Sequence, residues 1–398
     1  LLVATDNQSI LGIGDQGAGG MAISVGKLCL YCAGAGIHPE RTLPVCLDVG
    51  TNNVSLLDDH LYLGWPHRRL RGEPYFEFIE EFAAAVAEVF PGALLQWEDF
   101  RKDRALTILD TYRDRLLSFN DDVQGTGAVA VAGILAAMRG LGHKLEDQRF
   151  VIHGAGAAGV GIARQIRAAL RERGGDPWSV VALDSRGLLV EGEEHNDPYK
   201  GELMLPLELA KKHGLEDHVT HDLRSVVERF KPTVLIGTSG RPGAFNQEIV
   251  EEMATHCERP IIMPFSNPTD HSEARPEEVI RWTEGRALVA TGSPFDAVEY
   301  EGRTYRVGQG NNVFIFPGLG LGALLAGAST VSDSMISAAA DAVAESVTAE
   351  EFASGMLDPA VPRLRDVCHH VSARVMAAAS REGTGDRMSK EEIDSRIA

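Results

Sequence analysis

Short apolar segments alternate with segments of helical periodicity along most of this chain, and this alternation restricts the fold more than any other feature. Continuously apolar strands separated by helices are typical of a parallel sheet that helices cover on both faces. Beyond Phe316 only helical patterns remain, to about Arg381. The sequence therefore predicts an α/β fold with a helical C-terminus. The predicted strands include the first residues, LLVATD, and residues 45–47, 93–97, 150–153, 180–183, 233–236, 261–265 and 287–290.

Composition narrows the class of protein. The chain has 398 residues, enough for two domains, and its hydrophobic content of 44% is that of a globular protein. A net charge of −19 argues against nucleic acid as a partner, because phosphate binding needs a basic surface. The longest apolar stretch, residues 313–328, contains Pro317 and four glycines, which predicts a buried segment rather than a membrane span. Five scattered cysteines indicate a reducing compartment, so we expect a cytoplasmic protein without a membrane partner.

A glycine-rich loop follows the predicted strand at residues 150–153 and leads into a helix. Its sequence, GAGAAG, has the G-x-G-x-x-G spacing, in which the glycines allow a tight turn, a close approach of a pyrophosphate and close helix–strand packing. The N-terminus of the following helix then faces the phosphates. We expect a dinucleotide to bind here, and the residues that form the loop are Gly154, Ala155, Gly156, Ala157 and Gly159.

The choice of dinucleotide depends on the end of the next predicted strand, which is Asp184. A carboxylate at this position accepts hydrogen bonds from the adenosine ribose and repels a 2′-phosphate, which favours NAD over NADP. Ser185 and Arg186 follow, and an arginine here is well shaped to bind a phosphate. NAD is therefore the expected cofactor, and NADP stays the alternative.

A second loop, GIGDQG at residues 12–17, repeats the same glycine spacing. Gly19 and Gly20 delay the helix that follows it, so this loop is less able to hold a diphosphate. We expect a turn on the substrate side, with a second dinucleotide site as the alternative.

Two pairs of acids stand where predicted strands give way to turns. Glu98 and Asp99 end the segment LLQWEDF, and Asp121 and Asp122 lie in FNDDVQG. Convergent carboxylates repel one another unless a cation lies among them, and hard oxygen ligands select Mg²⁺ or Mn²⁺. Each pair is also placed where it can cap the N-terminus of a following helix, so both interpretations stay open from the residues alone.

One lysine and three amides complete the candidate residues. Lys27 lies in the apolar run ISVGKLCLY, where its ammonium group either finds a buried partner or extends to the surface. Burial is expected to lower the pKa of this lysine towards that of a general base. Asn267, Asn311 and Asn312 lie in predicted strand-end loops, where they either bind a carboxylate ligand or organise turns.

Together these segments resemble the malic enzyme family. The blocks ILGIGDQGAGGMAISVGKL, LPVCLDVGTNN, LLQWEDF, FNDDVQGTG, GAGAAGVGIA, SNPT, ATGSPF and GQGNNVFIFPG occur in the family's order, from Leu1 to about Arg381. The resemblance implies a divalent metal on Glu98, Asp99 and Asp122. It also implies that Asp121 orients Lys27. The substrate amides fall on Asn267 and Asn311, with Asn312 beside them.

The resemblance implies oxidative decarboxylation of L-malate to pyruvate and CO₂ with reduction of NAD. Lys27 removes the hydroxyl proton as hydride passes to the nicotinamide, and the metal polarises the carbonyl of the resulting 2-oxo acid. A homodimer or homotetramer is the expected assembly. We expect a Rossmann-type domain at residues 122–310, inserted into a substrate and metal domain formed by residues 1–121 and 311–398.

Two departures from the family pattern leave alternatives open. The family's general acid is a tyrosine in a region before the first matching block, and no tyrosine of this chain corresponds to it. We therefore expect a catalytic-core fragment, with a non-catalytic nucleotide-binding protein as one alternative. Many members also carry an arginine where this chain has Ser9. Malolactic enzymes, which convert malate to lactate and CO₂ with bound NAD, lack that arginine too and are the other alternative.

Overall fold

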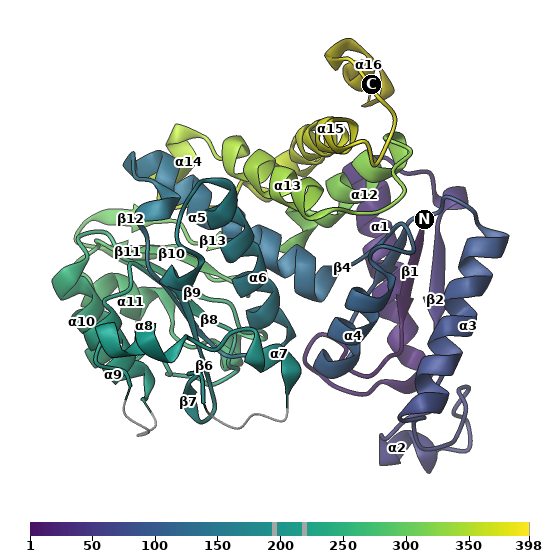
Figure 1. The fold of residues 1–398 in the computed structure, drawn as a ribbon, viewed down its shortest axis with the longest axis horizontal. Helices are drawn as coiled ribbons and strands as arrows, with labels where there is room; N and C mark the ends of the chain where they lie inside the picture. The colour runs from purple at the N-terminus through teal and green to yellow at the C-terminus, as the bar shows by residue number, and fades with distance from the viewer. Residues whose placement is uncertain (193–196, 217–220, 398) are drawn as a thin grey trace. The chain divides into compact units, whose positions relative to one another are not determined.

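The computed structural model describes residues 1–192, 197–216 and 221–397, and the chain divides into two compact units (Figure 1). Unit 1 comprises Leu1–Gly125, Val313–Ala339 and Leu364–Ala398, and unit 2 comprises Thr126–Asn312 and Ala340–Arg363. Residues 340–363, which we expected with the substrate domain, thus belong to unit 2. Two contacts hold this segment there. Arg173 donates to the Asp341 carboxylate at 2.8 Å, and Arg139 donates to the carbonyl of Ala344.

Unit 1 is built on a parallel sheet with the strand order β2-β1-β3-β4. Because all four strands run in one direction, their carboxyl ends lie along the same edge of the sheet. The strands are β1 (Leu2–Thr5), β2 (Leu43–Cys46), β3 (Leu95–Trp97) and β4 (Ser118–Asn120). The helices between them are α1 (Met21–Ala35), α2 (Val54–Leu57), α3 (Glu73–Val89) and α4 (Lys102–Tyr112).

The C-terminal part of unit 1 is helical, as the sequence predicts. Helices α12 (Phe316–Leu325) and α15 (Leu364–Glu382) pack against each other and against α1. Gly318 allows α12 and α15 to approach each other closely, because a Cβ atom at this position would lie 2.6 Å from the Val371 side chain. The remaining C-terminal helices of the chain are α13 (Asp333–Ser346), α14 (Ala349–Ala353) and α16 (Lys390–Ile397).

Unit 2 contains a seven-stranded sheet with the order β13-β10-β9-β8-β5-β6-β7, in which only β7 is antiparallel. After β5 the chain extends the sheet first on one side and then on the other, so β5 lies at the topological switch point. The strands are β5 (Phe150–His153), β6 (Val180–Asp184), β7 (Gly187–Leu188), β8 (Val234–Gly237), β9 (Ile261–Pro264), β10 (Leu288–Thr291) and β13 (Gly308–Gln309). A separate hairpin joins β11 (Val298–Tyr300) to β12 (Arg303–Tyr305).

Helices cover both faces of the unit 2 sheet. On one face, Val151, Val181 and Leu235 form a buried cluster with apolar residues of α9 (Leu223–Phe230), α10 (Gln247–His256) and α11 (Pro276–Trp282). Helices α5 (Thr126–Leu141) and α6 (Ala157–Glu172) contribute nothing to that cluster and pack against each other on the other face. The short helices are α7 (Pro198–Gly201) and α8 (Leu207–Lys212). The predicted α/β fold with a Rossmann-type domain is present.

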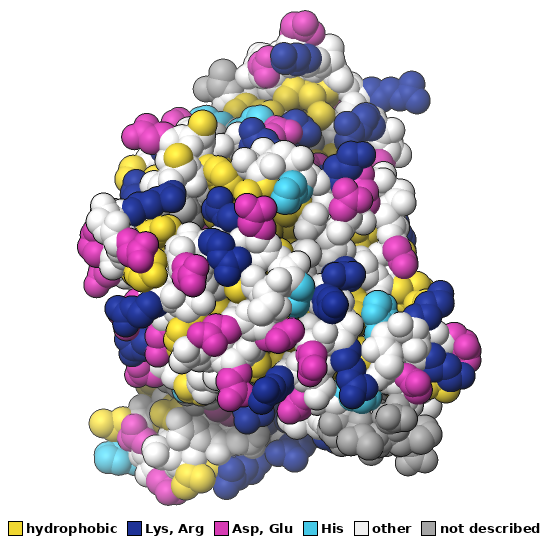
Figure 2. Space-filling view, turned by 90° about the vertical axis from the view of Figure 1, so that its left-hand side faces the viewer, with side chains coloured by type: hydrophobic (Ala, Val, Ile, Leu, Met, Phe, Trp, Pro, Cys, Tyr) yellow, Lys and Arg dark blue, Asp and Glu magenta, His cyan; other side chains and the backbone are white. Residues whose placement is uncertain are grey.

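Helix α1 and the turn before it, Gly17–Ala35, are long and apolar enough to meet a length-and-composition test for a membrane span. In unit 1 this helix packs against β1, β2, α12 and α15, and it buries Leu28, Tyr31 and Ala35. Of the apolar window that meets the test, 33% is buried in the fold. The face in Figure 2 carries interspersed basic and acidic side chains, without an extended basic patch in that view.

Candidate active site

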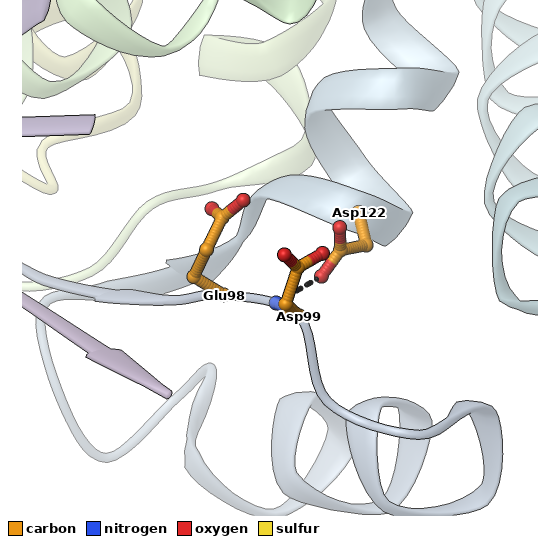
Figure 3. Close-up of side chains that lie close together, drawn as sticks. All are labelled: Glu98, Asp99 and Asp122. Atoms are coloured by element: carbon orange, nitrogen blue, oxygen red, sulfur yellow. Dashed lines mark hydrogen bonds between the residues drawn. The ribbon is translucent and has the colours of Figure 1, made fainter. Parts of the chain in front are cut away.

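Two pairs of acids meet at the carboxyl edge of the unit 1 sheet. Strand β3 leads directly into Glu98 and Asp99, and its neighbour β4 leads into Asp121 and Asp122, with Trp97 paired to Asn120. Side-chain oxygen atoms of Glu98, Asp99 and Asp122 all lie within 4.8 Å of one another (Figure 3). The structure therefore brings together the three acids to which the family resemblance assigns a metal.

The backbone around these acids holds them in place. Asp99 has a left-handed φ of 55°, and its N–H donates to Asp122 Oδ2 at 2.8 Å. Asp99 Oδ2 in turn accepts a hydrogen bond from the N–H of Leu11 at 3.0 Å. Helix α4 has Arg101 as its N-cap residue, so Asp99 is not a cap. Asp122 lies in a single π-helical turn, Asp121–Gly125, a feature that is frequent at functional sites.

Burial and mutual repulsion shape the protonation of the cluster. Glu98 is 1% exposed and Asp99 is 7% exposed. Burial, together with the charge of Glu98, raises the pKa of Asp99 to about 7. Burial and the neighbouring carboxylates also raise the pKa values of Glu98 and Asp122. A divalent cation among these oxygens would offset the repulsion, and an all-carboxylate donor set fits Mg²⁺ or Mn²⁺.

Lys27 points into the acidic cluster from α1. Its Nζ lies 2.5 Å from Asp121 Oδ2 and 2.9 Å from Glu98 Oε1, and its side chain is 13% exposed. The ammonium also lies 4.7 Å from the ring centroid of Phe316. The sequence left two possibilities open for the Lys27 ammonium group, pairing or surface exposure, and the structure shows a partly buried ion pair with Asp121.

The expected pKa of Lys27 was wrong in direction. Burial alone would lower the pKa of this lysine, but the carboxylates of Asp121 and Glu98 outweigh that effect and raise it. A sequence shows that a lysine lies in an apolar helix, but it does not show which acids the fold places against its ammonium group.

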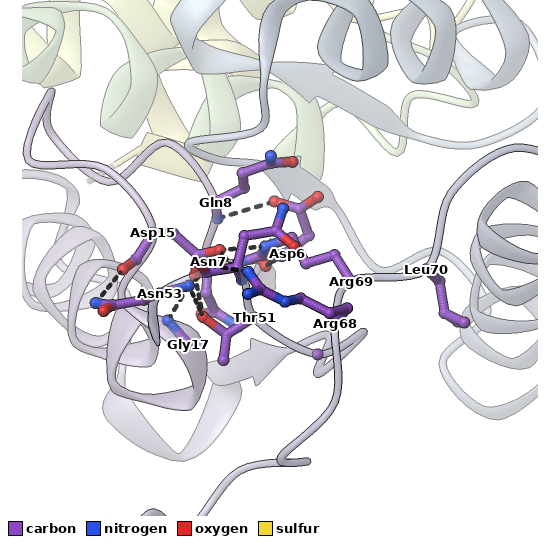
Figure 4. Close-up of polar contacts among 12 residues, drawn as sticks. Asp6, Asn7, Gln8, Asp15, Gly17, Thr51, Asn53, Arg68, Arg69 and Leu70 are labelled. Carbon is purple, nitrogen blue, oxygen red and sulfur yellow. Dashed lines mark hydrogen bonds and ion pairs between the residues drawn. The ribbon is translucent and has the colours of Figure 1, made fainter. Parts of the chain in front are cut away.

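The residues just before the GIGDQG loop lie beside the acids, because the N–H groups of Ser9 and Leu11 both donate hydrogen bonds to Asp99. That the loop lies on the substrate side stays a prediction. A polar network anchors this loop (Figure 4). Arg69, whose side chain is 0% exposed, donates to both carboxylate oxygens of Asp15 at 2.6 and 2.7 Å. The Asp15 carboxylate also accepts from the Thr51 hydroxyl at 2.8 Å. The sequence analysis missed Arg69, because nothing in HRRLRG distinguishes a buried arginine from solvated ones.

The glycine loop of unit 2 has the predicted geometry. Gly154 has φ 123°, and a Cβ atom there would lie 2.5 Å from the backbone of Thr238. A Cβ atom at Gly159 would lie 1.8 Å from the Gly154 carbonyl oxygen, so only glycine allows this helix–strand approach. Gly156 faces open space and is the N-cap residue of α6, which begins at Ala157. Ala155 between them is buried. The loop therefore leaves room for a phosphate at the N-terminus of α6.

A cavity of about 450 Å³ lies at the carboxyl ends of β5 and β6, and its lining includes Asp184, Ser185 and Arg186. Asp184 Oδ1 accepts from the N–H of Arg186 at 2.7 Å, and Oδ2 accepts from Lys200 Nζ at 2.6 Å. Although burial alone would raise it, the hydrogen bond from Lys200 lowers the pKa of Asp184. The Arg186 side chain is 57% exposed and its Nε lies 3.8 Å from the same carboxylate. The ion pair with Lys200 therefore holds the ionised Asp184 carboxylate in place.

The three predicted substrate amides lie in unit 2, whereas the acids and Lys27 lie in unit 1. Asn267 follows β9, and its Oδ1 accepts from the Ser293 hydroxyl at 2.5 Å. Asn311 and Asn312 follow β13, and Asn312 Nδ2 donates to the Thr126 hydroxyl at 3.1 Å. All three therefore lie at the carboxyl edge of the sheet that also presents the glycine loop.

Two family models match the sequence. Residues 1–113 match "Malic enzyme, N-terminal domain", and residues 123–380 match "Malic enzyme, NAD binding domain". The chain is 46% identical over 397 residues to an NAD-dependent malic enzyme of Sodalis glossinidius, covering 99% of this chain and 70% of that protein. It is 48% identical over 388 residues to NAD-dependent malic enzyme 3 of Bacillus subtilis, covering 96% of this chain and 68% of that protein.

Solved structures agree with these matches. The malic enzyme of Pyrococcus horikoshii superposes with a TM-score of 0.73 at 26% identity, covering 100% of this chain and 80% of that chain. The NAD-dependent malic enzyme of Thermotoga maritima superposes with a TM-score of 0.67 at 26% identity, covering 94% of this chain and 84% of that chain. This chain belongs to the malic enzyme family.

Proposed function

We propose that this protein is an NAD-dependent malic enzyme, which oxidatively decarboxylates L-malate to pyruvate and CO₂. The observation that carries the proposal is the partly buried Lys27–Asp121 pair beside three carboxylates that converge within 4.8 Å. This arrangement supplies both a proton acceptor and a cation site at one sheet edge. The NAD-dependent relatives and the match to an NAD binding domain support the cofactor.

Glu98, Asp99 and Asp122 are proposed to hold a Mg²⁺ or Mn²⁺ ion. When bound, this ion supplies a Lewis acid that polarises substrate oxygen atoms. Without a metal ion, the carboxylates of Asp121 and Glu98 raise the pKa of Lys27 and keep its Nζ protonated. With a cation held on Glu98, that carboxylate would attract the ammonium less, and Lys27 would release its proton more readily.

Lys27 is proposed to accept the hydroxyl proton of malate while hydride leaves for the nicotinamide. Asp121 accepts a hydrogen bond from Lys27 Nζ and so orients the lysine side chain. In unit 2, Asn267, Asn311 and Asn312 are proposed to donate amide hydrogen bonds to the substrate carboxylates. The glycine loop and Asp184 are proposed to bind the pyrophosphate and the adenosine ribose of NAD. A homodimer or homotetramer in the cytoplasm is the proposed state, and light scattering on the purified chain tests the assembly.

Incubation of the chain with L-malate, excess NAD and Mn²⁺ tests the proposed reaction. We expect NADH and pyruvate to accumulate in equal amounts, and both to be lost in Lys27→Ala. A chain that binds NAD and Mn²⁺ but converts no malate would contradict the proposal and would favour a non-catalytic nucleotide-binding role.

One observation favours a second candidate, the malolactic reaction. Ser9, which replaces the arginine of many family members, lies beside the cluster, with its N–H donating to the Asp99 carbonyl at 3.2 Å. A neutral residue here weakens the hold on a carboxylate ligand. The same incubation distinguishes the reactions, because the malolactic reaction yields lactate without net NADH.

A further inference from the structure

Gln96 contacts both α1 and the acidic cluster formed by Glu98, Asp99 and Asp122. Its side chain is 0% exposed in β3, two residues before Glu98 and therefore on the same face of the strand. Nε2 donates to Glu98 Oε2 at 2.7 Å, and Oε1 accepts from the hydroxyl of Tyr31 at 2.6 Å. Tyr31, one helical turn after Lys27, is also 0% exposed.

A carboxylate that binds a metal ion must be ionised, and with Glu98 ionised these groups permit only one orientation of the amide. An ionised carboxylate accepts hydrogen bonds and donates none, so Gln96 turns its NH₂ group towards Glu98. Its carbonyl oxygen then faces Tyr31, and the phenol must be the donor. The reversed amide would place two acceptors against each other and leave the phenol against the NH₂ group. Donation therefore runs in one direction, from Tyr31 through Gln96 to Glu98.

The two oxygens of Glu98 are thereby held from two sides. Lys27 Nζ lies 2.9 Å from Oε1, while Gln96 lies 2.7 Å from Oε2. Lys27 and Tyr31 also share Phe316 as a neighbour. The centroid of the Phe316 ring lies 4.7 Å from Lys27 Nζ and 5.0 Å from the centroid of the Tyr31 ring. Helix α1 thus acts on Glu98 directly through its lysine and indirectly through its tyrosine.

We infer that Gln96, oriented by Tyr31, is a positioning residue that fixes the carboxylate plane of Glu98 for a divalent cation. This inference rests on the proposed function, because it assumes that Glu98 is a metal ligand. Without the amide, Glu98 is free to rotate both oxygens towards Lys27, and an ion pair of that geometry competes with the cation. Partners that orient a metal ligand in this way typically change metal affinity by about 10–100-fold when they are removed.

The test is a titration of the purified chain with Mn²⁺, followed by electron paramagnetic resonance of the free ion. Gln96→Met keeps the length of the side chain and removes the donor, and we expect it to weaken Mn²⁺ binding by about 10-fold or more. Tyr31→Phe keeps the ring and frees the amide to reverse, so we expect a smaller loss in the same direction. Because Gln96 is fully buried, thermal unfolding of each variant is measured alongside, and Tyr31→Phe decides the question if Gln96→Met does not fold.

Tyr112→Phe is the matched control. The Tyr112 hydroxyl donates to a carboxylate oxygen of Glu80 at 2.8 Å in the same unit, and neither residue belongs to the acidic cluster. Its loss should leave Mn²⁺ affinity unchanged. Wild-type affinity in folded Gln96→Met or Tyr31→Phe would overturn the positioning role while leaving the metal site intact. Failure of the wild-type chain to bind Mn²⁺ would instead overturn the metal site, and the inference with it.

Discussion

The ammonium nitrogen of Lys27 lies 2.5 Å from Asp121 Oδ2, and the Asp121 side chain is fully buried. This pair joins α1 to the turn after β4, two segments far apart in the sequence. Lys27 compensates the buried charge of Asp121, so the removal of Lys27 leaves that carboxylate without this counter-charge.

Lys27→Ala is expected to lower kcat by about 10²–10⁴-fold, the range typical for loss of a general acid–base group. The affinity for NAD should be unchanged, because the glycine loop and Asp184 belong to unit 2. Steady-state kinetics and NAD titration separate the two quantities. Lys144→Ala, which removes an exposed lysine, is the control for charge. Equal losses in kcat and NAD affinity would mean that Lys27 is structural.

Asp122→Asn is expected to abolish stabilisation by Mn²⁺. In the wild-type chain, a cation that binds only the folded state raises Tm in proportion to the logarithm of its concentration. The variant keeps the acceptor for the Asp99 N–H but removes one charge, so its metal-free Tm should not fall. Thermal melts with and without Mn²⁺ test this. Asp103→Asn, at an exposed acid of unit 1, should respond to Mn²⁺ like the wild type.

Asp358 gives unit 2 a pH-dependent instability. It is 1% exposed, and neither carboxylate oxygen has a hydrogen-bond partner among the residues that the structure describes. Burial raises its pKa from 3.8 to about 7. Both states are protonated below pH 4; between about pH 4 and 7 the unfolded chain releases the proton while the folded chain keeps it. The group therefore destabilises the folded state progressively as pH rises through this window.

Asp358→Leu is accordingly expected to raise Tm at pH 8 and to have a much smaller effect at pH 5. The shift from 3.8 to about 7 corresponds to at most about 4 kcal/mol at pH 8. Calorimetry at both pH values provides the measurement, with Asp296→Leu as an exposed control in the same unit. A gain that is the same at both pH values would show that packing, and not the buried charge, is responsible.

Asp184→Ala is expected to lower kcat/KM for NAD by about tenfold, equivalent to roughly 1.4 kcal/mol, and to improve the relative use of NADP. The carboxylate is the proposed acceptor for the ribose hydroxyls, and its loss releases Lys200 and Arg186 to face a 2′-phosphate. Kinetics with each cofactor test this, and Asp176→Ala serves as a control at an exposed acid. An unchanged NAD preference would remove Asp184 from the cofactor site.

Much of the fold followed from the sequence because apolar periodicity reports burial directly. Residues 150–153 form β5 as predicted, and residues 180–183 lie within β6. Strands β7, β11 and β12 were not predicted, because β7 has only two residues and β11 and β12 contain charged residues. Their pairing comes from their neighbours rather than from their own pattern.

The acids of the candidate site were candidates because two pairs stand at strand ends, and the resemblance to malic enzymes then assigned three of them to a metal. Gln96 and Tyr31 were not identified, because a glutamine in LLQWEDF and a tyrosine in an apolar helix look like ordinary residues of a core. Only the fold places the phenol, the amide and the Glu98 carboxylate in one line. The raised pKa of Lys27 escaped prediction for the same reason, since its cause is the three-dimensional approach of Asp121 and Glu98.

Anomalous diffraction from crystals of the chain grown with Mn²⁺ and L-malate tests the central claim most directly. We expect one strong manganese peak in unit 1, about 2.0–2.6 Å from oxygens of Glu98, Asp99 and Asp122, with malate oxygens completing the coordination. A chain that holds manganese at other residues, or whose three carboxylates bind no ion while malate is bound elsewhere, would contradict the account.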